Sequence, residues 1–302
     1  MNTNYDKIKS DLLDFGKRNS ACIGQYQRLY KAESIEDVIS VVKDNFEWCI
    51  KYKDFADVLM ANREQFAEHR IWINQNVEIQ EGVGFLLVTE GSINAESYGT
   101  STINAESYGT STINVKSYGT STINAESCDT STINAKSCDT SMINVKSWDT
   151  STINAESYGT STINVKSWGT STINVKSLGS SMINAKSWDT STINAKSWDT
   201  STINAESCDT STINAKSWDT SMINVKSWDT STINAESYGT STINAESWDT
   251  STINAESWDT STMVIHTLNI ECEVNDRSIA RYIYDNRIVI ADTSVTVEQY
   301  HK

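Results

Sequence analysis

The sequence predicts a mainly β fold, a β-solenoid in which short strands stack along one axis. Three observations carry this prediction. A ten-residue unit, typically STINAESWDT, recurs seventeen times over residues 91–260 of the 302-residue chain without insertion or deletion. Apolar or small side chains alternate with polar ones inside the unit, and turn-forming residues close it. A fixed period of this kind decides the architecture before any other signal is considered.

The alternation has a period of two. Numbered with Ser101 as position 1, positions 1, 3, 5 and 7 carry Ser, Ile, Ala or Val, and Ser, whereas positions 2, 4 and 6 carry mostly Thr, then Asn, then Glu or Lys. Period two indicates strands, and because ten is even the same positions face inward in every unit. We therefore expect a solenoid of ten-residue coils, stacked about 4.8 Å apart into a rod roughly 80 Å long.

Other architectures fit less well. Ten residues make about 2.8 turns of α-helix, which would spread the apolar positions around the cylinder. Disorder would not require Ile at a fixed position in every unit. A four-sided pentapeptide-repeat helix remains an alternative because Ile103 and Tyr108 are five residues apart. That fold needs a small residue two positions before each central apolar one, where this chain has Glu106.

Position 6 tests which way the strands face. It is lysine in four successive units, at Lys166, Lys176, Lys186 and Lys196, so one ammonium group would stack above another in each coil. Burying unpaired charges costs several kcal/mol each. Position 6 is therefore predicted to face water.

The remaining positions follow from this facing. The Asn at position 4 is expected to form an amide ladder along the rod. The Trp, Tyr, Cys or Leu at position 8 is expected to lie along an edge, half covered by its neighbours. Asp or Gly at position 9 and Thr at position 10 form the corner. The inward serines must find partners among themselves or on the backbone.

Four segments make up the chain. Residues 1–70 are predicted to be a helical head, residues 71–90 an N-terminal cap of the solenoid, residues 91–260 the solenoid of seventeen units, and residues 261–302 a β-rich C-terminal cap. Uncovered ends of a solenoid expose pairing edges, so both ends need covering.

Helical spacing supports the head. Ile8, Leu12 and Phe15 fall on one helix face, and Ser34 with Asp37 forms a capping box that begins a second helical stretch. A third stretch opens at Phe55 and runs towards Phe66.

Composition excludes several classes. The chain has 39 acidic and 24 basic residues, a net charge of −15, which disfavours a nucleic-acid partner. It has no proline and six cysteines, which excludes collagen-like and disulfide-dense chains. The sequence has no apolar stretch long enough to cross a membrane. The first residues lack the features of a signal peptide, so we expect a cytoplasmic location or a phage particle.

The units NAES-Trp, NAKS-Trp and NVKS-Trp, with a helical head and a strand-rich tail, resemble decapeptide-repeat proteins of gut Bacteroidota and their prophages, in which units such as N-A-T-V-x-A-W-x recur. The resemblance covers head, array and tail. It implies a β-solenoid and no chemistry, so it transfers no functional residues.

Catalytic chemistry has little support in the sequence. The three histidines, His69, His266 and His301, lie in different segments, and no locally spaced Cys–His or Ser–His–Asp pattern occurs. We expect no enzyme, no cofactor and no metal. The acidic run Asp189, Asp199, Asp209, Asp219 and Asp229 could hold cations, but one carboxylate per coil is too sparse for calcium and suits a turn better.

Two array cysteines occupy an aromatic position in adjacent units. Cys128 and Cys138 are expected to lie directly above one another. Free thiols are the expected state, with a disulfide between these two as the alternative.

Threonine ladders are the first candidate binding surface. Positions 10 and 2 would place threonines on one side of the strand, with the intervening Ser turned inward, as in repeat-type ice-binding surfaces. The candidate residues are Thr100, Thr102, Thr110, Thr112, Thr150 and Thr152. Met142, Met182 and Met222 interrupt one ladder at forty-residue intervals. Threonine also simply favours strands.

The aromatic column is the second candidate surface, because stacked rings could bind a glycan. Its candidate residues are Trp188, Trp198, Trp218 and Trp228. Structural packing of the rings is the alternative.

Copy number favours a structural role. Residues 121–160 and 201–240 differ at one position, Cys138 against Trp218, as tandem duplication of a block produces. We therefore expect a non-enzymatic structural or interaction rod, a spacer or scaffold encoded by a phage or mobile element. Its head would form a homo-oligomer or dock on a protein or glycan partner. A binding module that uses the threonine or aromatic ladders is the alternative.

Overall fold

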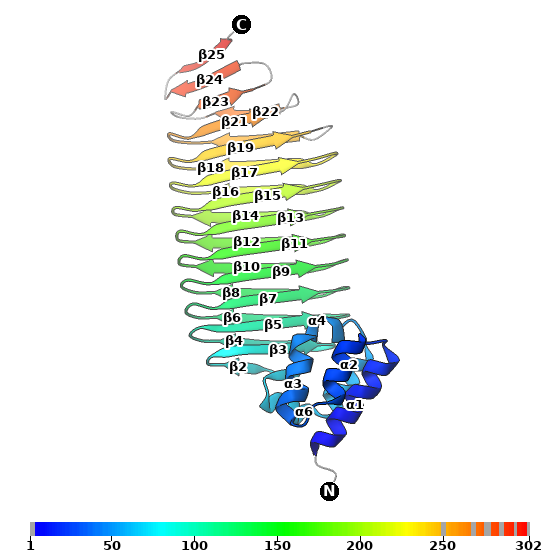
Figure 1. The fold of residues 1–302 in the computed structure, drawn as a ribbon. Helices are drawn as coiled ribbons and strands as arrows, with labels where there is room; N and C mark the ends of the chain where they lie inside the picture. The colour runs from blue at the N-terminus through cyan, green and yellow to red at the C-terminus, as the bar shows by residue number, and fades with distance from the viewer. Residues whose placement is uncertain are drawn as a thin grey trace.

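The computed structural model describes residues 4–248, 252–266, 270–274, 279–283, 287–292 and 295–300. It consists of a helical head at one end of a long stack of strands (Figure 1). The β-solenoid predicted from the decapeptide repeat is confirmed. Among the described residues, no helix is long and apolar enough to cross a bilayer.

The predicted ten-residue coil is wrong, because each coil contains twenty residues. Strand β5 (Ser101–Ser107) pairs in parallel with β7 (Thr122–Ser127), which places Ile103 beside Ile123. The intervening strand β6 (Ser111–Ser117) pairs instead with β8 (Thr132–Ser137). Each decapeptide is therefore half a coil, and the array is a rod roughly 40 Å long rather than 80 Å.

The reach of the chain explains why a coil needs twenty residues. A seven-residue strand such as β5 is about 23 Å long, whereas the three residues that follow it span at most about 11 Å. The turn cannot return the chain to its starting point, so the next decapeptide must run back as a second strand. Alternate strands accordingly point in opposite directions in Figure 1.

Two parallel sheets result. Sheet A contains β1, β3 and the other odd-numbered strands up to β23, followed by β24 and β25, and sheet B contains the even-numbered strands from β2 to β22. The first strands of sheet A are β1 (Ile71–Ile73) and β3 (Gly82–Val88), and those of sheet B are β2 (Val77–Ile79) and β4 (Gly91–Ser97). The later sheet-A strands of the array are β9 (Met142–Ser147), β11 (Thr162–Ser167), β13 (Met182–Ser187), β15 (Thr202–Ser207), β17 (Met222–Ser227) and β19 (Thr242–Ser247). Those of sheet B are β10 (Thr152–Tyr158), β12 (Thr172–Leu178), β14 (Thr192–Trp198), β16 (Thr212–Ser217), β18 (Thr232–Ser237) and β20 (Thr252–Ser257).

The inner faces of the two sheets form one continuous core. Ile and Ala or Val from both sheets belong to a single hydrophobic cluster that extends from Ile79 to Ile265. Most of these side chains are fully buried. The predicted facing is therefore confirmed, with positions 1, 3, 5 and 7 inside and position 6 outside.

Only a minority of the inward serines have partners, so the expectation that all would find them is wrong. Ser111 and Ser231 donate to the position-8 carbonyls of Tyr108 and Trp228, at 3.2 and 2.9 Å. Most other buried serine hydroxyls, including that of Ser101, have no partner among the described residues. The strand carbonyls already accept the bonds between coils, so few acceptors remain for a hydroxyl in the interior.

The corners use left-handed backbone, as their composition predicts. Position 9 has positive φ throughout the described turns, between 61° and 68° where it is Asp in the array. At Gly179 φ is 100°, and an added Cβ would lie 2.5 Å from the carbonyl oxygen of Gly159. Glycine is therefore required there, because an L side chain would be both strained and too close to backbone.

The head consists of six helices around its own core. They are α1 (Asn4–Arg18), α2 (Ile23–Tyr30), α3 (Ile35–Asp44), α4 (Phe46–Cys49), α5 (Asp54–Ala61) and α6 (Arg63–Glu68). Ile8, Leu12 and Phe15 are buried together on one face of α1, as their spacing predicts. The capping box of Ser34 and Asp37 begins α3, also as predicted.

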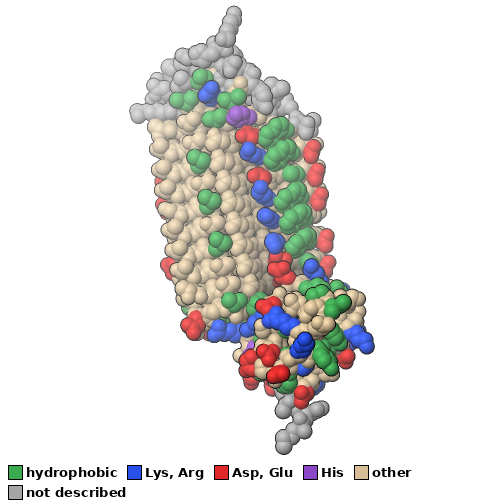
Figure 2. Space-filling model, in the orientation of Figure 1, with side chains coloured by type: hydrophobic (Ala, Val, Ile, Leu, Met, Phe, Trp, Pro, Cys, Tyr) green, Lys and Arg blue, Asp and Glu red, His purple; other side chains and the backbone are tan. Residues whose placement is uncertain are grey.

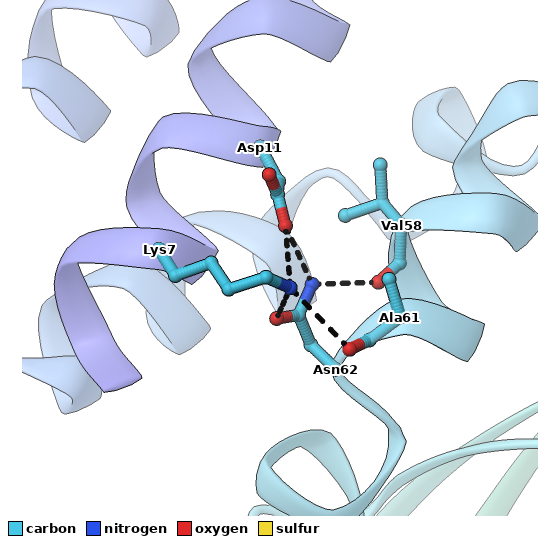
Figure 3. Close-up of polar contacts among 5 residues, drawn as sticks. All are labelled: Lys7, Asp11, Val58, Ala61 and Asn62. Atoms are coloured by element: carbon cyan, nitrogen blue, oxygen red, sulfur yellow. Dashed lines mark hydrogen bonds and ion pairs between the residues drawn. The ribbon is translucent and has the colours of Figure 1, made fainter. Parts of the chain in front are cut away.

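The third helical stretch is broken at Asn62, which is only 2% exposed. The Asn62 amide donates to the Val58 carbonyl and to Asp11 Oδ2, both at 2.9 Å. Its oxygen accepts from Lys7 Nζ at 3.0 Å. Figure 3 shows these side chains of α1 converging on the break. The amide thus replaces the helix bonds that end here and fixes α1 against α5.

Replacing Asn62 by Leu is expected to destabilise the head by about 2 kcal/mol, because a buried hydrogen-bonded side chain is lost and its partners are left unpaired. Hydrogen exchange of α1 and α5 measures this loss. Lys7→Met is the control, since it removes a single half-exposed partner. Equal protection in the Asn62 variant and the parent chain would contradict the assignment.

The head and the rod share side chains at their junction. Ile71, Ile73 and Leu87, which belong to β1 and β3, are part of the head's hydrophobic cluster. The ring of Phe46 lies 5.0 Å from that of Phe85 in β3. The first coil therefore contributes side chains to the core of the head.

The far end departs from the repeat. Strands β21 (Thr262–His266) and β22 (Ile270–Val274) continue the parallel ladders. The last three strands, β23 (Ile279–Tyr282), β24 (Arg287–Asp292) and β25 (Val295–Tyr300), pair in antiparallel fashion. The cap predicted over 261–302 lies partly outside the described residues, as does His301.

Candidate functional site

The twenty-residue coil gives the rod two broad faces and two edges. Each face carries parallel columns from positions 2, 4 and 6, and each edge carries columns from positions 8 and 9. Figure 2 looks onto sheet A, where hydrophobic groups mark the position-2 column, blue and red mark position 6, and green and red columns follow at the edge. Residues twenty apart in sequence are neighbours along a column.

The threonine candidates fall into three places. Thr102 lies on sheet A, and Thr112 and Thr152 lie on sheet B. Thr100, Thr110 and Thr150 are exposed in the turns. The expected double ladder on one flat surface is therefore wrong, because position 10 belongs to the corner and each face carries one threonine column.

The two position-2 columns differ. Met142, Met182 and Met222 all lie on sheet A, where each is 42–43% exposed and alternates with threonine. The sheet-B column is threonine in eight successive strands: Thr112, Thr132, Thr152, Thr172, Thr192, Thr212, Thr232 and Thr252. Forty residues are two coils, which is why these three methionines lie on the same face. The sequence contains this difference between the two threonine columns, but the difference becomes apparent only when alternate units are assigned to different sheets.

Asparagine forms the predicted ladder on both faces, with partners twenty residues apart. Asn124 Nδ2 donates to Asn104 Oδ1 at 2.9 Å on sheet A, and Asn134 Nδ2 donates to Asn114 Oδ1 at 2.7 Å on sheet B. The pattern continues to Asn244 and Asn254 with the same donor direction. These bonds hold the amide side chains in one orientation along each column.

The position-6 columns are mixed in charge. The four successive lysines of the sequence divide between the faces, with Lys166 and Lys186 on sheet A and Lys176 and Lys196 on sheet B. Glutamates pair with several lysines along each column, as in the 2.7 Å contact of Lys186 Nζ with Glu206 Oε2. Such exposed pairs contribute little each, so they offset repulsion rather than hold the rod together.

The aromatic candidates divide between the two edges. Trp188 and Trp228 lie on one edge with Cys208 between them, whereas Trp198 and Trp218 stack directly on the other edge at 4.8 Å with planes 4° apart. The rings are half-buried, as predicted for an edge. Because stacking covers the ring faces, it favours the packing interpretation over sugar binding for the continuous parts of the columns.

The cysteine and aspartate pairings expected from ten-residue coils are also wrong. Cys128 and Cys138 follow strands of different sheets, so they lie on opposite edges, and both are free thiols. The acidic run divides in the same way, with Asp189, Asp209 and Asp229 on one edge and Asp199 and Asp219 on the other. All five lie in turns with positive φ, and Asp189 accepts a hydrogen bond from the Gly169 N–H of the neighbouring turn at 3.2 Å.

A groove lies between the head and the outer face of sheet A. Glu47 and Lys51 form its wall on the head, and Glu106, Glu126 and Lys146 line it on the rod. Lys146 Nζ contacts Glu126 Oε1 at 2.5 Å. Burial, together with the neighbouring Glu126 and Glu47 carboxylates, raises the pKa of Glu106 to about 8. Sequence reasoning could not find this group, because its environment depends on where the head docks.

The raised pKa of Glu106 predicts that docking of the head weakens as the pH increases. The unfolded side chain ionises near 4.5, whereas the folded one keeps its proton to about 8, so stability falls between these values and is constant above them. Hydrogen exchange of α4 across pH 5–9 measures the effect. Glu106→Gln is expected to remove this slope, and Glu156→Gln, on sheet B, to leave it. A slope unchanged in Glu106→Gln would contradict the assignment.

These features define a two-sheet β-solenoid repeat protein with a helical head. No family model, no curated protein and no solved structure matches the chain.

Proposed function

We propose that the chain is a non-enzymatic rod that acts as a spacer or scaffold between its helical head and a partner bound further along it. The carrying observation is the equivalence of the coils, each of which adds the same rise and the same columns. A reaction centre needs a unique set of groups, whereas a spacer needs only length and stiffness.

The junction supports this proposal. The first coil contributes to the head's core through Ile71, Ile73 and Leu87, so the head is held in a fixed direction. A rod attached through a flexible linker would not transmit length or orientation. On the head, Ile23 and Tyr30 are 76% and 68% exposed at the two ends of α2, where a second copy or a protein partner would dock.

Removal of whole coils tests the spacer. Deleting residues 161–200, which are two coils, is expected to shorten the rod by roughly 10 Å and to leave head and coils folded. Small-angle scattering measures length, and hydrogen exchange measures folding. Loss of fold throughout the rod would overturn the proposal, because copy number would then be fixed by stability.

Binding of ordered water or ice is the second candidate function, and the uninterrupted threonine column of sheet B favours it. Its hydroxyls repeat every 4.8 Å or so beside the fixed amide ladder. Sheet A lacks this regularity because methionines interrupt it.

Matched substitutions separate the two faces. Thr172→Tyr on sheet B is expected to abolish inhibition of ice recrystallisation, and Thr162→Tyr on sheet A to leave it unchanged. Thermal hysteresis and a glycan array complete the comparison. Inactivity of the parent chain in all three assays would contradict ice binding and glycan binding, and the spacer would be the remaining function.

A further inference from the structure

The aromatic column beside the head has a gap that is one ring thick. Backbone bonds align its members, since Cys128 N donates to Ser107 O at 3.1 Å and Trp148 N donates to Ser127 O at 3.0 Å. Cys128 therefore lies between Tyr108 and Trp148, where a ring would otherwise stack. Two steps of the stack separate these rings by about 9.6 Å, which leaves room for one planar ring.

Stacked rings elsewhere show what such a space accommodates. Trp148, Trp168 and Trp188 follow one another at 5.4 and 4.8 Å, with planes 7° and 4° apart. A ring at the Cys128 level would have the same contacts above and below. The residues that border the gap are Tyr108 and Trp148, and Trp binds cations most strongly among aromatic side chains.

The gap coincides with an open pocket at the head. Tyr108, Cys128 and Trp148 line that pocket together with Glu47 and Lys51 of the head. Comparable gaps occur at Cys138, Leu178 and Cys208, further along the described array. The gap at Cys208, on the same edge, lies four coils farther along the rod, so it provides a natural control.

The charges around the pocket favour a cation. Glu47 and Glu126 face it, against Lys51 and Lys146, and Asp129 and Asp149 lie in the adjoining turns. Glu106 adds a further negative charge as it ionises near pH 8. Lys146 is already paired with Glu126. Burial first, and then the carboxylates of Glu106, Asp129, Glu126 and Asp149, raise the pKa of the Cys128 thiol to about 11, so the back of the pocket stays neutral.

We propose that this pocket binds a planar aromatic cation, whose ring stacks between Tyr108 and Trp148 and whose positive charge lies near Glu106 and Glu47. The ring of the ligand fills the missing level of the aromatic column. Its positive charge stabilises the ionised form of the Glu106 carboxyl, which the docked head has removed from solvent. A bound cation favours the ionised form of Glu106, so binding strengthens as the pH rises towards 8.

Calorimetric titration of the full chain with N-methylacridinium, and with acridine as its neutral counterpart, tests the proposal. The expected result is one site for the cation and at least tenfold weaker binding of acridine at pH 8. Glu106→Gln should weaken the cation several-fold and remove the pH dependence. Equal affinity for both ligands would overturn the charge assignment and with it the proposal.

Variants of the column locate the site. Cys128→Trp fills the gap and should abolish binding, whereas Cys208→Trp fills the distant gap and should not change it. Cys128→Ser keeps the gap and should bind normally. Trp148→Leu removes one wall of the gap and should lose binding. Leucine is tolerated at position 8, because Leu178 occupies it in another unit, so this variant tests the site even if Cys128→Trp does not fold. Binding that survives Trp148→Leu, or that Cys208→Trp weakens equally, would overturn the proposal.

Discussion

Replacement of Ile203 by Asp is expected to break the rod at its middle. Ile203 is fully buried and lies between Ile183 and Ile223 in sheet A. An ionised carboxylate there would have no partner and no water, at a cost of about 4 kcal/mol or more. Because every coil rests on the next, the damage should extend to the strands on both sides.

Thr202→Asp is the matched control, since Thr202 is the preceding residue of the same strand and faces outward. It should change stability by no more than about 0.5 kcal/mol. Hydrogen exchange of residues 181–230 is the appropriate measurement, because repeat arrays open in parts and a single unfolding temperature averages over them. Similar loss of protection in both variants would refute the assignment of inner and outer faces.

Deletion of one decapeptide should have a different geometric result from deletion of two. Removing residues 161–180 takes out a full coil, shortens the rod by about 4.8 Å and keeps every later strand in its sheet. Removing residues 161–170 takes out half a coil, so every later strand changes sheet and the far end turns by half a revolution about the rod. Both variants should fold equally well, because the two halves of a coil use the same unit.

Spin labels on unnatural amino acids at Ile23 and Met222 distinguish these outcomes without using the native thiols. Both sites are exposed in the parent chain. In the ten-residue deletion the second label should cross to the opposite face, a displacement of about 10 Å or more relative to the twenty-residue deletion. Identical distances in the two variants, or unfolding of the shorter deletion, would contradict a coil of two decapeptides.

The direction in which each side chain faces could be predicted from the repeat. The size of the coil requires, in addition, a comparison of strand length with the reach of the turn. Alternation over positions 1–7 correctly identified the buried Ile103 and the outward Glu106, and Tyr108 is half-buried, as expected for the edge at position 8. The same seven positions also imply a straight strand about 23 Å long, which three residues cannot reverse and return. Equating the repeat with the coil therefore overlooked a constraint that chain length imposes.

The junction could not be predicted in the same way. The helices of the head were apparent from the spacing of Ile8, Leu12 and Phe15, but nothing in that spacing says which outer face they cover. The pocket at Cys128 exists because Glu47 of α4 and the following Lys51 lie beside this level of the column. The raised pKa of Glu106 has the same origin, because it follows from burial of this carboxyl and from the neighbouring Glu126 and Glu47 carboxylates, the second of which belongs to the head.

The amide ladders make the rod electrically directional. In both sheets each asparagine donates to the one in the coil nearer the head, so the small dipoles of the side-chain amides add along the axis. At the far end the Asn254 oxygen is buried without a hydrogen-bond partner among the described residues. Aligned bonds of this kind polarise one another. Coils of the same unit therefore still define a polar axis along the rod.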